Sequence, residues 1–189
     1  SFLPKNDYVL EIDNKSMTNR PDLWSARGIA REIASIFGYK LKPESDLLLP
    51  LKTIRDESLS FALEDISFQN QAPSACRGFS LTKFEGLQNP ASSLSIALRL
   101  LLCGYKVINL LVDLTNYVML DWGIPLHAYD ADLMKDKQII VRTAKDKETL
   151  KLLDNSTVEL TDQDTVIASS TQALALAGVK GGLDKSIFP

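Results

Sequence analysis

One histidine and a threonine–asparagine pair are the residues whose types and spacing suit chemistry. His127 is the only histidine of the 189-residue chain, and it lies in the segment IPLHAYD, shortly after Thr115 and Asn116. A histidine is a general base near neutral pH or a donor that orients a substrate. The hydroxyl and the amide of the pair can hold an ester or a developing oxyanion. The residue types also leave a structural role open, with Thr115 as a helix N-cap and His127 as a neutral imidazole bonded to a backbone carbonyl.

A glycine-rich segment, LALAGVKGG at residues 174–182, is the second feature of interest. It lacks the spacing of a P-loop and of the dinucleotide-binding fingerprint. Its glycines either let a ligand approach the backbone closely or form a turn. A nucleophile elbow of the G-x-S-x-G type is absent from the sequence, so a hydrolase with a serine triad is not supported.

Composition limits the classes of function. The net charge is −3, so we expect any contact with nucleic acid to be local rather than a broad grip on phosphates. Cys76 and Cys103 lack metal-binding spacing, which predicts reduced cysteines, no zinc site and a cytoplasmic protein. The sequence has no run of about 18 apolar residues and no secretory signal at its start, so no membrane segment is predicted.

The N-terminal half predicts a helical piece followed by a linker. We expect a strand at 8–12, then a helix over 23–37 that is capped by Asn19 or Asp22 and stopped by Gly38. A linker is predicted over 39–52, which contains Pro43 and Pro50, and a domain boundary is expected near residue 50. Alternation predicts strands at 58–65 and 79–87, and an almost wholly apolar stretch predicts a deeply packed helix over 90–103.

The aliphatic stretch 106–114 predicts a central strand that is buried on both faces and turns into a short helix at Thr115. Free N–H groups at that junction would add anion-binding donors beside the pair. Further strands are predicted at 138–144, 164–170 and 172–179, with a hairpin over 148–161. The sum is an α+β fold: a mixed or antiparallel sheet packed with helices and preceded by a small helical piece.

Three segments together resemble the bacterial phenylalanine–tRNA ligase beta subunit, in that family's order. They are TNRPDLWSARGIAREIASIFG, GYKVINLLVDLTNYVMLDWGIPLHAYD and LALAGVKGG, and they span most of residues 8–182. The resemblance implies a partial N-terminal helical domain over 1–50 and a linker with a first strand over 51–74. It implies a tRNA-editing domain over 75–189, truncated at its C-terminal end.

The activity that the resemblance implies is hydrolysis of mischarged Tyr-tRNA(Phe), in support of Phe-tRNA synthesis and translational fidelity. The implied partners are tRNA(Phe) and the alpha subunit, in a heterotetramer of two alpha and two beta subunits in the cytoplasm. ATP and Mg²⁺ would be used on the alpha subunit, so no cofactor or metal is expected in this chain. The alternatives are a non-catalytic scaffold that binds tRNA and the alpha subunit, and an unrelated free-standing hydrolase.

The resemblance also assigns the site. Thr115, Asn116 and His127 would be the catalytic residues, and Ala177 and Gly178 would bind the substrate. We expect the first two to position the ester and the attacking water, and His127 to contact the terminal adenosine or that water. The chain departs from the family pattern at three positions: Ile124 replaces Gln, Tyr129 replaces Phe and Lys180 replaces Met. The family's glutamate that reads the tyrosine hydroxyl would lie beyond Pro189.

Overall fold

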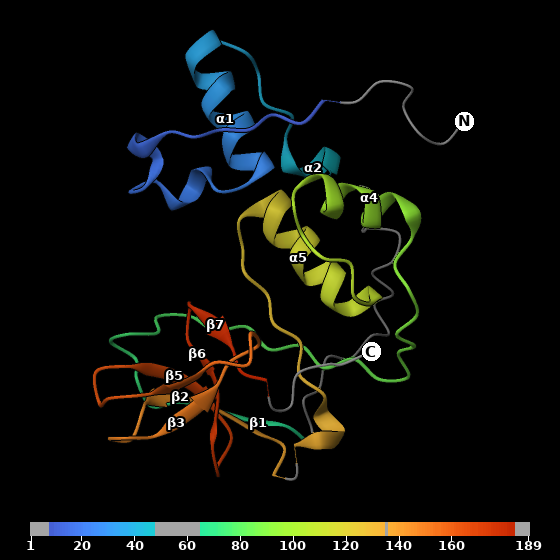
Figure 1. Cartoon of the computed structure of the whole chain (residues 1–189). Coiled ribbons are helices and arrows are strands. Elements are labelled where there is room, and N and C mark those ends of the chain that lie inside the picture. Colours follow the sequence, from blue (N-terminus) through green and yellow to red (C-terminus); the bar gives the residue numbers. More distant parts are fainter. Residues whose placement is uncertain (1–7, 48–64, 135, 184–189) are drawn as a thin grey trace. The chain divides into compact units, whose positions relative to one another are not determined.

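The computed structural model describes residues 8–47, 65–134 and 136–183, which form two compact units (Figure 1). The first unit contains described residues 8–47 and 89–126 and is helical. The second contains 65–88, 127–134 and 136–183 and carries the strands. The predicted α+β class is confirmed. Both units are discontinuous in sequence, whereas the predicted domains at 1–50, 51–74 and 75–189 are continuous blocks; that division stays a prediction.

Helix α1, Ala26–Phe37, is the predicted N-terminal helix with a different cap. The Ser25 hydroxyl accepts a hydrogen bond from the Gly28 N–H at 2.9 Å, so the cap predicted at Asn19 or Asp22 is wrong. Pro21–Leu23 instead forms a separate 3-10 turn. Pro21 starts this turn, and Trp24 ends it because its backbone is not helical. The predicted stop is confirmed, since Gly38 ends the helix with a φ of 69°.

The predicted strand at 8–12 is wrong, because residues 8–14 form neither helix nor strand. The side chains of Tyr8, Val9 and Leu10 are exposed. β-branched and aromatic residues favour a strand only where they pack on a half-buried sheet surface, and this segment has no such surface. Two short helical pieces complete this part of the chain: Lys15–Met17 and α2, Glu44–Leu47.

Helix α5, Leu110–Trp122, replaces the buried strand that was predicted at 106–114. The Asn109 side chain accepts a hydrogen bond from the Val112 N–H at 3.0 Å, which starts the helix five residues before Thr115. The helix ends at Gly123, whose φ is 77°. A short aliphatic run does not by itself distinguish a strand from a helix, and here the cap at Asn109 decides.

Helix α4, Leu94–Leu102, confirms the helix predicted over 90–103, and Gly104 follows it with a φ of 79°. The predicted deep packing is wrong. Leu100 is fully buried, but the side chains of Leu94 and Leu101 are 63% and 56% exposed. The helix therefore packs through one face only, although its own apolar side chains lie on all of its faces.

The second unit contains a five-stranded sheet in the order β1-β2-β5-β6-β7 (Figure 1). Its first pair is parallel and every other pair is antiparallel, which gives a mixed sheet. The strands predicted at 138–144, 164–170 and 172–179 are confirmed. The bounds are β1 Ser67–Asn70, β2 Gln138–Thr143, β5 Thr165–Ala168, β6 Ala173–Leu176 and β7 Lys180–Gly181.

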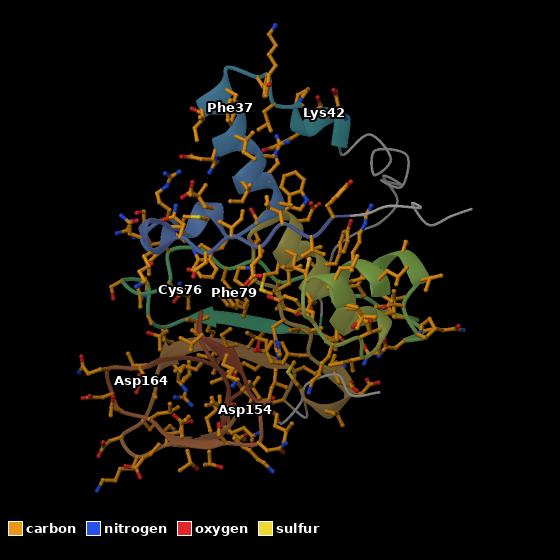
Figure 2. All side chains as sticks on the ribbon, turned by 45° about the horizontal axis from the view of Figure 1, so that its top comes forward. Phe37, Lys42, Cys76, Phe79, Asp154 and Asp164 are labelled. Atoms are coloured by element: carbon orange, nitrogen blue, oxygen red, sulfur yellow. The ribbon has the colours of Figure 1, made fainter. Side chains whose placement is uncertain are left out.

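A separate hairpin packs on the sheet through Leu150 and Leu152, and it confirms the hairpin predicted over 148–161. Its strands are β3, Thr149–Lys151, and β4, Thr157–Glu159; Asn155 in the turn has a φ of 67°. Figure 2 labels Asp154 in the same turn. The hairpin joins the sheet through a bridge between Leu152 and Gly182. The core beneath it consists of Ala144, Leu150, Leu152, Leu160, Val166, Ala168 and Ala173.

The strand predicted at 79–87 is wrong, because this segment has no regular structure. Phe79, labelled in Figure 2, stacks on Phe68 of β1 with ring centroids 4.9 Å apart. Its segment thus packs on the sheet instead of extending it. The strand predicted at 58–65 lies outside the described residues, except for Asp65 in a turn. An additional short helical turn, Ala131–Leu133, precedes β2.

Candidate functional site

Thr115 and Asn116 lie in the middle of α5, and both are half-buried. The Thr115 hydroxyl donates a hydrogen bond of 2.7 Å to the Val112 carbonyl. Its donor is therefore in use, while its lone pairs remain able to accept. The side-chain amide of Asn116 has no hydrogen-bond partner among the described residues, so it has both donors and an acceptor to offer.

The backbone donors at the start of α5 are all in use, so the expectation of free N–H groups at Thr115 is wrong. Leu110 N–H donates to the Pro90 carbonyl at 2.9 Å, and Leu111 N–H donates to the Asn89 side chain at 3.1 Å. The side chain and the backbone carbonyl of Asn109 accept from the next two N–H groups. The helix start is closed by the protein itself and offers no anion site.

Asp113 is a buried anchor of this helix that the sequence reasoning missed. It is fully buried, and its carboxylate accepts hydrogen bonds from the Ser92 hydroxyl at 2.5 Å and the Ile108 N–H at 2.9 Å. A carboxylate inside the aliphatic run LLVDL was the available signal, because a buried charge needs hydrogen bonds. Asp113 thereby ties the segment before α5 to the turn that carries Thr115.

His127 belongs to the second unit, where its imidazole lies against the backbone of Gly181. A β-carbon added to Gly181 would lie 2.5 Å from His127 Cε1 and 3.1 Å from each ring nitrogen. Tyr129 meets the imidazole edge-on, with ring centroids 4.6 Å apart and an interplanar angle of 72°. The residue as a whole is exposed, yet neighbouring atoms crowd the ring. This desolvation lowers the pKa of His127 below its usual 6.5, so the ring is neutral at pH 7.

The hydrogen bonding of His127 differs from the structural role left open by the sequence. No described residue forms a hydrogen bond with either ring nitrogen. The imidazole is therefore not a histidine bonded to a backbone carbonyl within the described part of the chain. Both nitrogens remain able to bind a ligand, one as donor and one as acceptor.

Ala177 and Gly178 lie in the tight connection between β6 and β7. The Ala177 N–H donates to the Thr165 carbonyl at 2.9 Å, which anchors the start of the connection to β5. Gly178 is exposed and has a φ of 71°, and a β-carbon there would meet nothing within 4 Å. The strand that follows carries Gly181, so the glycine-rich segment and His127 come together within this unit.

The five predicted site residues are thus divided between two units that are described separately. Thr115 and Asn116 belong to the helical unit, whereas His127, Ala177 and Gly178 belong to the sheet unit. That they form one site stays a prediction. Sequence reasoning missed the contact between His127 and Gly181, for which the glycine pair itself was the signal, because a glycine admits a ring against its backbone.

The helical unit also contains an open pocket of about 470 Å³. It is lined by Thr18, Pro21, Trp24, Tyr105, Met119, Leu120, Gly123 and Pro125. Neither Thr115 nor Asn116 lines it. Its lining is largely apolar and aromatic, so it suits an apolar group rather than a phosphate.

Across the described ranges, no group of three or more His, Cys, Asp or Glu side chains could hold a metal ion. Cys76 is half-buried and Cys103 is exposed, and both are free thiols. No helix among the described residues is both long and apolar enough to cross a bilayer.

Known proteins match the chain over nearly its whole length. The B3/4 domain family matches residues 75–188. The phenylalanine–tRNA ligase beta subunit of Solibacter usitatus is 40% identical over 182 residues, which is 96% of this chain and 22% of that protein. The corresponding subunit of Anaeromyxobacter dehalogenans is 37% identical over 186 residues, 98% of this chain and 22% of that protein. That of Thermotoga maritima is 34% identical over 186 residues, 97% of this chain and 22% of that protein.

The chain spans about a fifth of the length of these curated relatives. The resemblance on which the sequence analysis depended is confirmed by both comparisons. The family match covers more than half of the chain, including His127 and the glycine-rich segment. The chain therefore belongs to the B3/4 domain family, as a member similar to phenylalanine–tRNA ligase beta subunits.

Proposed function

We propose that this chain is the tRNA-editing part of a phenylalanine–tRNA ligase beta subunit and that it hydrolyses the ester of Tyr-tRNA(Phe). The observation that carries the proposal is its similarity to such subunits over nearly its whole length. The neutral imidazole of His127, with both nitrogens free of described partners, adds a group that suits ester hydrolysis.

The physical need for such a step is clear. A synthetic pocket for phenylalanine does not strongly reject tyrosine, which only adds a hydroxyl to the same ring. A second site that hydrogen-bonds this hydroxyl discriminates in the opposite direction. Phenylalanine in that second site would leave polar groups unpaired, at a cost of about 1–3 kcal/mol for each group.

The proposed reaction needs no protein nucleophile. Water attacks the carbonyl carbon of the ester, the bond from that carbon to the ribose oxygen breaks, and the water proton ends on the ribose oxygen. Thr115 and Asn116 position the ester and the water, and His127 contacts the terminal adenosine or the water. Ala177 and Gly178 border the tyrosyl side chain, and the hydroxyl of the tRNA itself assists. The products are tyrosine and tRNA(Phe).

The partners follow from the same proposal. The chain works with the alpha subunit, in an assembly of two alpha and two beta subunits, and with tRNA(Phe). ATP and Mg²⁺ serve the synthetic site of the alpha subunit. The net charge of −3 favours a local contact with the end of the tRNA over a broad grip on its phosphates.

The proposal is tested by deacylation of purified Tyr-tRNA(Phe) with the intact ligase. We expect His127→Ala and Thr115→Ala each to slow hydrolysis by about tenfold or more, since each removes a group that positions the ester or the attacking water. Synthesis of Phe-tRNA should be unchanged. Thr115→Ser, which keeps the hydroxyl, and Asp146→Ala, at an exposed position, are the controls. Wild-type rates in both alanine variants would remove these residues from the mechanism.

A further inference from the structure

The contact between His127 and Gly181 is not explained by backbone geometry. Gly181 does not have a positive φ, so its backbone conformation is open to other residues. What another residue would meet is the imidazole: an added β-carbon would lie 2.5 Å from Cε1. Gly178 is the opposite case, with a φ of 71° and open space around it. Gly181 therefore provides room for the His127 ring.

Tyr129 forms a second wall for the same ring. Its own ring meets the imidazole edge-on at 4.6 Å and packs against the buried cluster of Met134, Ile139 and Leu174. The Tyr129 hydroxyl is buried and has no hydrogen-bond partner in the described chain. Among the described residues, packing on the apolar cluster rather than a hydrogen bond therefore holds the Tyr129 ring in place.

The imidazole is in contact with Gly181 and Tyr129, and none of the described residues forms a hydrogen bond with it. A histidine tautomer is normally set by the hydrogen bond that the other ring nitrogen makes. Here no described residue supplies such a bond. Within the described part of the chain, packing therefore fixes where the ring lies, and no residue there commits either nitrogen as donor or acceptor.

We infer that Gly181 and Tyr129 are positioning residues for His127, which hold its imidazole by packing and leave both ring nitrogens open to a bound ligand. This inference concerns how the ring is held. It therefore stands or falls separately from the hydrolysis of Tyr-tRNA(Phe), which gives the ligand its proposed identity.

The charged groups on these elements do not account for the state of the ring. Asp130 follows Tyr129, and its carboxylate accepts a hydrogen bond from the Asp132 N–H at 2.9 Å. Lys180 precedes Gly181, and its ammonium group is bound to Asp154 at 2.5 Å. Desolvation remains as the cause of the lowered pKa of His127.

The test is nuclear magnetic resonance on the full 189-residue chain. Its single histidine gives one set of ring signals, so the pKa and the tautomer of His127 are read without ambiguity. In the wild type we expect a pKa below 6.5, a Cε1 proton shifted by the Tyr129 ring, and ring nitrogens that report a mixture of both tautomers.

Two substitutions remove the two walls. Gly181→Ala places a methyl group where the imidazole lies, so the ring moves into solvent and its pKa rises towards 6.5. The obstructing atoms belong to a side chain, so the backbone need not move. Tyr129→Leu removes the ring-dependent shift of the Cε1 proton, whereas Tyr129→Phe keeps it. Gly178→Ala is the matched control and should leave the His127 signals unchanged.

Several outcomes would overturn the inference. One is a Gly181→Ala chain whose His127 pKa and proton shift match the wild type. Another is a single tautomer, locked by a hydrogen bond, in the ligand-free chain. Should Gly181→Ala fail to fold, the comparison of Tyr129→Leu with Tyr129→Phe still decides, because equal His127 signals in both would exclude a positioning role for the ring.

Discussion

The Ser92 hydroxyl donates a 2.5 Å hydrogen bond to the carboxylate of Asp113, which is fully buried in the helical unit. The Ile108 N–H donates to the same carboxylate. Replacing Asp113 by alanine removes a fully buried side chain and leaves two donors on partly exposed residues without their acceptor. We expect a loss of about 2 kcal/mol in the free energy of unfolding, because each lost hydrogen bond to a charged group costs about 1–3 kcal/mol and solvent can reach these donors. Urea denaturation followed by circular dichroism measures this loss.

Asp113→Asn separates the role of hydrogen bonding from that of the side chain's volume. The amide oxygen can still accept one of the two bonds, so we expect a smaller loss of about 1–2 kcal/mol. Asp146→Ala, at an exposed position, should change the stability little. Equal stability of Asp113→Ala and Asp146→Ala would show that the buried carboxylate does not anchor α5.

The ion pair between Glu148 and Arg142 predicts how the stability of the sheet unit changes at acidic pH. It binds Arg142 through two hydrogen bonds, of 2.7 and 2.8 Å, and both side chains are 12% exposed. The guanidinium group of Arg142 lowers the pKa of Glu148 from 4.5 to about 2. The stabilisation is complete above the unfolded value and is lost as the pH falls through about 2.

We therefore expect Glu148→Gln to be less stable than the wild type at pH 7, by about 1–2 kcal/mol once screening by solvent is included. The difference should shrink as the pH falls from 5 towards 2. Denaturant titrations across this range measure it. Glu159→Gln, at an exposed position in β4, is the control. A difference that does not change with pH would contradict the assigned ion pair.

The lowered pKa of His127 predicts the pH dependence of the proposed editing step. Desolvation disfavours the charged imidazole, so the ring is protonated only below 6.5. If the neutral ring is the working form, the part of deacylation that depends on His127 should be constant from pH 8 to 6.5 and should fall at lower pH. The measurement is the ratio of wild-type to His127→Gln deacylation rates by the intact ligase.

The same group contributes to stability with a defined sign. The unfolded chain takes up the His127 proton more readily than the folded chain does, so the wild type should lose stability relative to His127→Gln as the pH falls below 6.5.

The pH dependence of deacylation has a contrary outcome of its own. If the ratio of the wild-type rate to the His127→Gln rate rises on acidification, the protonated ring is the active form.

The glycine-rich segment 174–182 predicts unequal effects of the same substitution at two of its glycines. An alanine β-carbon at Gly182 would lie 2.3 Å from the Leu174 carbonyl oxygen, so β6 must shift. We expect Gly182→Ala to cost about 3 kcal/mol of unfolding free energy, as overpacking of a core does. Gly178→Ala meets no atom and should cost about 1–2 kcal/mol for its positive φ alone. Thermal denaturation measures the stability of both variants. A Gly178→Ala chain less stable than the Gly182→Ala chain would contradict this prediction.

The sequence predicted the elements of this fold best where local signals agreed. Gly38 marks the end of a helix as expected, and Gly104 and Gly123 end the later helices in the same way, because a positive φ is a local property. The short β-branched runs of β2 and β5 and the polar turn of the hairpin were similarly sufficient. The strand predicted from the aliphatic run before Thr115 was wrong. The helix cap at Asn109 determines the local structure there more strongly than the aliphatic and β-branched composition does.

The candidate site was predictable only in part. Residue types and family resemblance named His127 and Gly178, but the contact of His127 with Gly181 joins two residues that lie far apart in the chain. Strand β1 was missed because its residues, SFQN, are all exposed and lack alternation of buried positions. Such features arise from tertiary pairing rather than from local sequence.

Strand β1 is paired in parallel with β2, although the helices α4 and α5 lie between them in the chain. A cut of the backbone anywhere in that inserted stretch would leave β1 joined to the sheet by non-covalent contacts only, namely its ladder hydrogen bonds and the packing of Phe68. During synthesis on the ribosome, the edge of the sheet must also wait until the whole insertion has emerged. The closure of this long loop makes β1 a late and reversible addition to the sheet, and amide hydrogen exchange should find it the first strand to open.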